Sequence, residues 1–215
     1  MRRLNACTGV GLAACVVFGG SNARAERRTV EVVTRVDVLL TTAPSLPAAA
    51  RTAMMNEAAD IWRQHGIALD WLRPTDIRPA APNRLRVLVV PNRPTSVRPD
   101  EPFAVGELVR PASGHPVALI SINSAQRLVS SLRGRAGYEL IAIDERRLGV
   151  VLGRALAHEI GHYLLGTHTH ATNGLMRPQF DALEFTDLRV GTFTLDTDAA
   201  DWLRNRNADT FAYVR

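Results

Sequence analysis

Residues 156–166 read Leu-Ala-His-Glu-Ile-Gly-His-Tyr-Leu-Leu-Gly and place two histidines four positions apart, with a glutamate directly after the first. Residues four apart on a helix share one face, so the imidazoles of His158 and His162 can bind one metal ion. Glu159 is displaced around the helix by one residue, where its carboxylate flanks the metal and can take a proton from water. The spacing therefore predicts a zinc site with an adjacent general base.

The surrounding residues predict that this pentapeptide lies late in a long helix. The helix is expected to begin near Asp144, which is a suitable N-cap, with Glu145 in its first turn. Apolar residues recur on most of its faces as far as Leu164, which is typical of a helix buried inside the protein. Because ionisable side chains are costly to bury without partners, the two histidines and the glutamate favour a functional role.

The segment after this helix carries Gly166, His168, His170 and Met176, the last within Gly-Leu-Met-Arg-Pro. Together with the pentapeptide, these residues resemble the metzincins, zinc peptidases whose helix turns at a glycine, supplies a third histidine and places a methionine beneath the metal. The resemblance implies an α+β (α/β-like) domain. Its parts are a mixed twisted sheet, a backing helix, an active-site helix and a small C-terminal subdomain with the Met-turn at Met176.

The third zinc ligand stays open between two histidines. In the usual metzincin pattern the glycine comes three residues after the second helix histidine, whereas Gly166 comes four after His162. His168 keeps the overall distance to the third ligand. His170 is favoured, because the sequence is also similar to uncharacterised exported bacterial zincin-like proteins that have a histidine at this place.

These features imply a zinc-dependent metallopeptidase that acts on peptide or protein substrates, with Glu159 as general base. Its cofactor is Zn²⁺, held by the two helix histidines and His170. A gluzincin-like alternative takes a carboxylate as third ligand, with Glu184 nearest and Asp187 next. A second alternative is a non-catalytic zinc-binding or interaction protein on the same fold, in which all four zinc positions are filled, for example by both His168 and His170.

The first 25 residues predict a signal peptide. Two arginines precede an apolar stretch, and Ala-Arg-Ala at 23–25 has the small-x-small pattern of a cleavage site. Cleavage there is favoured over lipidation at Cys15, because the apolar run continues past that cysteine. No later stretch approaches the roughly 20 apolar residues of a membrane span. The mature chain, residues 26–215, is therefore expected to be periplasmic or secreted and without a transmembrane segment.

Composition limits the remaining function classes. The only two cysteines, Cys7 and Cys15, lie in the predicted leader, so the mature chain would have no disulfide and depends on packing for stability. Removing the three arginines of the leader lowers the net charge from +5 to +2, which is no footprint of nucleic-acid binding. No repeat or composition break interrupts residues 26–215, which predicts a single catalytic domain. The sequence does not specify an oligomeric state.

Hydrophobic periodicity predicts the other elements. Alternating or continuous apolar residues indicate strands at 29–40, 67–72, 85–90, 103–109 and 117–122. A helical period indicates helices over 48–65 and 197–205. The metzincin resemblance adds that an edge strand, either 103–109 or 117–122, pairs with an extended substrate.

Overall fold

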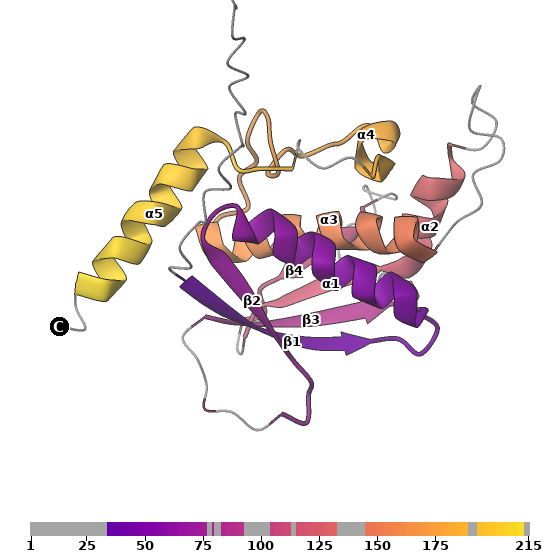
Figure 1. Ribbon diagram of the computed structural model, residues 1–215, viewed down its shortest axis with the longest axis horizontal. Coiled ribbons are helices and arrows are strands. Elements are labelled where there is room, and N and C mark those ends of the chain that lie inside the picture. The colour runs from indigo at the N-terminus through magenta and orange to yellow at the C-terminus, as the bar shows by residue number, and fades with distance from the viewer. Residues whose placement is uncertain are drawn as a thin grey trace, which may run out of the picture.

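The computed structural model describes residues 34–76, 79, 83–92, 104–112, 115–132, 145–188 and 193–212. The elements in chain order are β1 (Thr34–Thr42), α1 (Ala48–Arg63), β2 (Ile67–Leu72), β3 (Arg84–Val90), β4 (Gly106–Val109), β5 (Val117–Ser121), α2 (Ile122–Ser130), α3 (Glu145–Leu165), α4 (Ala182–Thr186) and α5 (Thr197–Ala212). The strands form one layer, and α1 and α3 lie side by side across it (Figure 1).

The sheet has five strands in the order β2-β1-β3-β5-β4. The pairs β1–β2, β1–β3 and β3–β5 are parallel, whereas β4 pairs antiparallel with β5. The predicted mixed sheet is therefore confirmed. Of the two strands considered for the edge, β4 holds that position, and β5 lies inside the sheet.

The core lies between the sheet and the two long helices. In β1, Val36 and Val38 are fully buried while Arg35 is exposed, so one face of the strand packs and the other faces outward. Helix α1 buries Met54 and Trp62 against this core. Helix α3 contacts α1 as well as β4 and β5, and it therefore lies over the antiparallel edge of the sheet.

Most predicted elements exist, with shifted ends. Strand β1 ends at Thr42, beyond the expected 40, and residues 29–33 lie outside the described part of the chain. Strand β5 ends at Ser121, because this residue is the N-cap of α2. The Ser121 side chain accepts a hydrogen bond from the Ser124 amide. Periodicity did not predict helix α2. Helix α4 was likewise not predicted, and α5 runs to Ala212 instead of 205.

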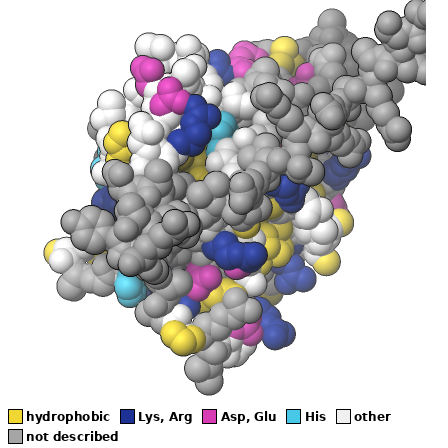
Figure 2. Space-filling view, turned by 60° about the vertical axis from the view of Figure 1, so that its left-hand side comes forward, with side chains coloured by type: hydrophobic (Ala, Val, Ile, Leu, Met, Phe, Trp, Pro, Cys, Tyr) yellow, Lys and Arg dark blue, Asp and Glu magenta, His cyan; other side chains and the backbone are white. Residues whose placement is uncertain are grey.

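Charged groups of both signs mix on the surface. Figure 2 shows arginine and acidic side chains interspersed over one face of the molecule. Arg35 pairs with Asp70 and Arg73 with Asp76, each at 3.3 Å and exposed on the arginine side. Such pairs contribute little to stability, so the packed core carries the fold.

The predicted leader, residues 1–25, lies outside the described residues and stays a prediction, as does its cleavage. So does the helix N-cap expected at Asp144. Within the described ranges, none of the helices combines the length and apolar character needed to cross a membrane.

Candidate metal centre

Helix α3 carries His158, Glu159 and His162 in a stretch that is buried on most sides. Just before it, Nε1 of Trp62 in α1 donates a hydrogen bond to the carbonyl of Ala157, over 3.1 Å. The side chains of Glu159 and His162 are largely shielded, and both residues are 5% exposed. The three polar groups are thus held by a helix that is itself fixed in the core.

The helix ends where the chain reverses at Gly166. This glycine has a φ of 70°, in the left-handed region that residues with a side chain adopt only at a cost. The next segment returns toward the helix, and the amide of Ala171 donates to the carbonyl of Met176 over 2.9 Å. The reversal brings His170 back over the helix.

Three histidines come together at this place. His158, His162 and His170 each offer one ligand atom, and these atoms all lie within 4.8 Å of one another. The ring centroid of His170 lies 5.4 Å from that of His158 and 4.9 Å from that of His162. This group of described residues could hold a metal ion, and its members come from the end of α3 and the returning segment.

The alternative ligands lie elsewhere. The ring of His168 is 5.9 Å from that of His162, and His168 is outside the group of mutually close ligand atoms. The carboxylate of Glu184 pairs with Arg177 over 2.5 Å. Neither Glu184 nor Asp187 belongs to the histidine group. The arrangement therefore favours His170 among the candidates for the third position.

Backbone carbonyls orient both helix histidines. Nδ1 of His158 lies 2.8 Å from the carbonyl oxygen of Leu175, and Nδ1 of His162 lies 2.9 Å from that of Thr167. A carbonyl oxygen only accepts hydrogen bonds, so each Nδ1 must carry the hydrogen. The Nε2 atoms therefore keep their lone pairs, as metal ligation requires.

Both histidines favour the neutral form. Burial lowers the pKa of His158 from 6.5 to about 4, against the hydrogen bond to Leu175, which raises it. Burial and the neighbouring His158 likewise lower the pKa of His162 to about 4. Imidazoles with such pKa values are uncharged at neutral pH, so only one ring nitrogen carries a hydrogen. The uncharged imidazole is the form that binds metals.

Glu159 packs against the edge strand. A Cβ placed on Gly106 of β4 would lie 2.8 Å from Oε1 and 2.9 Å from Cγ of Glu159, so the absence of a side chain there makes room for the glutamate. Just beyond the end of this strand, Nη2 of Arg110 donates to the carbonyl of His162 over 2.8 Å. The edge strand and the histidine helix are thus joined at two points.

Met176 packs directly on helix α3 at Gly161. A Cβ on Gly161 would lie 2.2 Å from the sulfur of Met176, so this close approach depends on a glycine inside the pentapeptide. Met176 is 2% exposed. This contact joins the turn that contains Met176 to helix α3. The expected Met-turn role of Met176 beneath a metal stays a prediction.

Sequence reasoning missed several residues that shape this site, among them Gly106, Arg110, Arg154 and Arg177. One signal was present, because Arg154 is a lone cation in an apolar helical stretch and therefore needs a buried partner. Contacts of Gly106 and Arg110 depend on how distant segments pair, which one sequence does not state.

No protein-family model matches this chain, and none of the curated proteins compared with it matches either. Among solved structures, archaemetzincin from Methanopyrus kandleri is similar with a TM-score of 0.45 and 14% sequence identity. The match covers 86% of this chain and 99% of the archaemetzincin chain. A likeness this distant does not identify what the chain does.

Proposed function

We propose that this chain is an exported zinc-dependent metallopeptidase that hydrolyses peptide bonds with Glu159 as general base. The observation that carries the proposal is the group of His158, His162 and His170, whose ligand atoms lie within 4.8 Å of one another. The buried Glu159 comes directly after the first of these histidines in the same helix.

The donor set fits zinc. Three imidazole nitrogens are ordinary ligands of a catalytic zinc, which keeps a further position for water or substrate. Both helix histidines are neutral at neutral pH and keep Nε2 free, so binding at these two residues displaces no proton. A zinc ion held there would act as a Lewis acid that polarises a carbonyl and acidifies water.

Glu159 supplies the proton transfers. Its carboxylate accepts the proton of the attacking water and then delivers that proton to the leaving amine. The missing side chain at Gly106 leaves room for this carboxylate between the helix and strand β4. General-base catalysis requires such positioning, because the carboxylate must reach the proton that it removes.

The edge strand β4 fits an extended peptide as substrate. It pairs with β5 on one side and stands last in the strand order of the sheet. A sheet edge offers backbone donors and acceptors to an added strand. Because Gly106 of β4 touches Glu159, a peptide lying along this edge would pass the general base.

The catalytic role is tested by Glu159→Gln. We expect this variant to keep about one zinc per chain and to lose about 100- to 10,000-fold in the rate of peptide hydrolysis. Zinc is measured by elemental analysis, and hydrolysis of a mixed peptide pool by mass spectrometry. Glu145→Gln is the matched control, because Glu145 is an exposed residue at the start of the same helix. Undiminished hydrolysis by Glu159→Gln would contradict the proposal.

The non-catalytic alternative has less support. One way for it to fill all four zinc positions uses both His168 and His170 as ligands, and His168 lies outside the histidine group.

Export is supported by the leader pattern of residues 1–25. Sequencing the N-terminus of protein recovered from outside the cytoplasm should give Glu26 as first residue. Recovery of the full chain from the cytoplasm alone would exclude export.

A further inference from the structure

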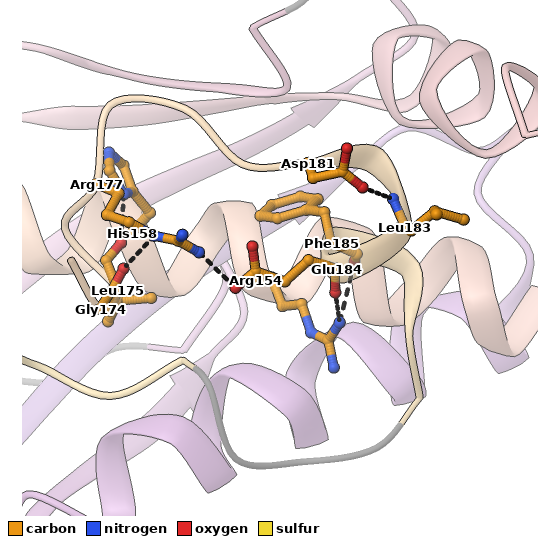
Figure 3. A network of polar contacts seen from close by, with 9 residues as sticks. All are labelled: Arg154, His158, Gly174, Leu175, Arg177, Asp181, Leu183, Glu184 and Phe185. Atoms are coloured by element: carbon orange, nitrogen blue, oxygen red, sulfur yellow. Dashed lines mark hydrogen bonds and ion pairs between the residues drawn. The ribbon is translucent and has the colours of Figure 1, made fainter. Parts of the chain in front are cut away.

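Arg154 is a buried charge one helical turn before His158. Its side chain is 1% exposed, and its Nε donates to the carboxylate of Glu57 in α1 over 2.7 Å. Its Nη1 donates to the carbonyl oxygens of Glu184 and Phe185, each over 3.1 Å. Because a buried guanidinium is costly without partners, these contacts fix α4 against α3 (Figure 3).

The Glu184 side chain extends this link toward the turn at residues 174–177. Its carboxylate accepts from Nη2 of Arg177 over 2.5 Å, and both side chains are about three-quarters shielded from solvent. Nε of the same arginine donates to the carbonyl of Gly174 over 3.3 Å. The planar guanidinium of Arg177 thus binds α4 through the Glu184 carboxylate and the turn through the Gly174 carbonyl.

This turn also holds His158. The carbonyl of Leu175 accepts from Nδ1 of His158 over 2.8 Å, and the amide of Leu175 donates to the carbonyl of Thr194 over 2.6 Å. The backbone of Gly174 and Leu175 is therefore held by hydrogen bonds with Arg177, His158 and Thr194. Figure 3 shows the continuous series from Arg154 through Glu184 and Arg177 to His158.

We infer that Arg177 and Glu184 are positioning residues that hold the Leu175 carbonyl against His158 and thereby tune the histidine site for its metal. The inference rests on the proposed function, since it assigns the metal to these histidines. Groups that hydrogen-bond to a ligating histidine set its tautomer and orientation, and their loss costs about 10- to 100-fold in metal affinity. Arg154 supports the same series by anchoring the backbone of α4.

The test uses Glu184→Gln, Arg177→Lys and the double variant. Gln keeps the volume of the side chain without its charge, and Lys keeps the charge without the planar fork. We expect the dissociation constant for zinc, measured by competition with a chromophoric chelator, to rise about 10- to 100-fold in each variant. The double variant should lose no more than the worse single one, because both changes break one series.

A second readout separates positioning from mere stabilisation. In zinc-free protein, ¹⁵N chemical shifts of the imidazoles report which nitrogen carries the hydrogen, with the His158 signal assigned by its absence in His158→Gln. Wild type should show hydrogen on Nδ1, and the variants a mixture of tautomers. Asp70→Asn is the matched control, since it breaks the distant pair with Arg35 at similar exposure of the carboxylate and should change neither readout.

Unchanged zinc affinity together with an unchanged His158 tautomer in both single variants would overturn the inference, even if their unfolding free energy falls. Wild type that binds no zinc would instead contradict the proposed function. The tautomer comparison still decides in that case whether Arg177 and Glu184 position His158. Weaker zinc binding with mixed tautomers, while Asp70→Asn behaves as wild type, would support the inference.

Discussion

At the scale of single residues, the candidate centre depends on the segment after α3 as much as on α3 itself. His158 and His162 share a helix face, yet each ring is oriented by a carbonyl from the later segment, at Leu175 and Thr167. The same segment supplies His170. The turn at Gly166 is therefore part of the site, because it returns this segment over the helix.

The two loop histidines should differ in their effect on zinc. His170→Ala removes one of three clustered ligand atoms, so we expect the zinc content to fall from about one per chain to near zero after dialysis. His168→Ala is the matched control two residues away and should keep its zinc. Elemental analysis of both variants checks this. Zinc retained in both would exclude His170 as a ligand.

Local spacing explains which site residues could be predicted. The i, i+4 relation of His158 and His162 is set by helix geometry alone. The choice between His168 and His170 depends on where the helix ends and how the chain leaves it, and the glycine is shifted by one residue from the metzincin pattern. The structure groups His170 with the helix histidines because the chain reverses at Gly166.

At the scale of elements, strand β4 connects the sheet to the candidate centre. It contacts α3 directly and lies at the edge of the sheet. Periodicity predicted a strand here, but it did not predict that this strand pairs with β5. Periodicity could not predict α2 or α4, because these helices of nine and five residues have too few turns to show a helical period.

Gly106→Ala should impair turnover while leaving the metal in place. The added Cβ would lie 2.8 Å from Oε1 of Glu159, so the carboxylate must shift away from β4. We expect the rate of peptide hydrolysis to fall about 100-fold, the usual cost of displacing a catalytic group by about 1 Å. Zinc content should stay at the wild-type value.

Val109→Ala at the other end of β4 is the control for general weakening of the strand. Its hydrolysis rate should stay near that of wild type. If Gly106→Ala hydrolyses peptides as fast as wild type, close contact with β4 does not position Glu159.

At the scale of the whole molecule, one packed layer of helices on a sheet supports the two neutral histidines of α3, His158 and His162. The order of the strands and the pairing of α1 with α3 depend on contacts between distant segments, which periodicity does not contain. Burial of these histidines links the site to the stability of the fold, because folding keeps protons off groups that the unfolded chain protonates readily.

The zinc-free protein should therefore lose stability in mild acid. Burial holds the pKa of His158 and of His162 at about 4 in the folded chain, and burial also lowers the pKa of His65, against an ordinary value of 6.5. Between pH 6.5 and 4 the unfolded chain binds more protons, so the unfolding free energy falls as pH falls. From pH 7 to 5 we expect a loss on the order of 2 kcal/mol from each of His158 and His162.

Chemical denaturation of chelator-treated protein at several pH values measures this loss. His158→Gln is the appropriate comparison, because it removes one of the buried imidazoles and should flatten the dependence between pH 7 and 5. A denaturation midpoint that is the same at both pH values in wild type would mean that the folded chain protonates these histidines as easily as the unfolded chain does. In that case their burial could not be what keeps Nε2 free for a metal.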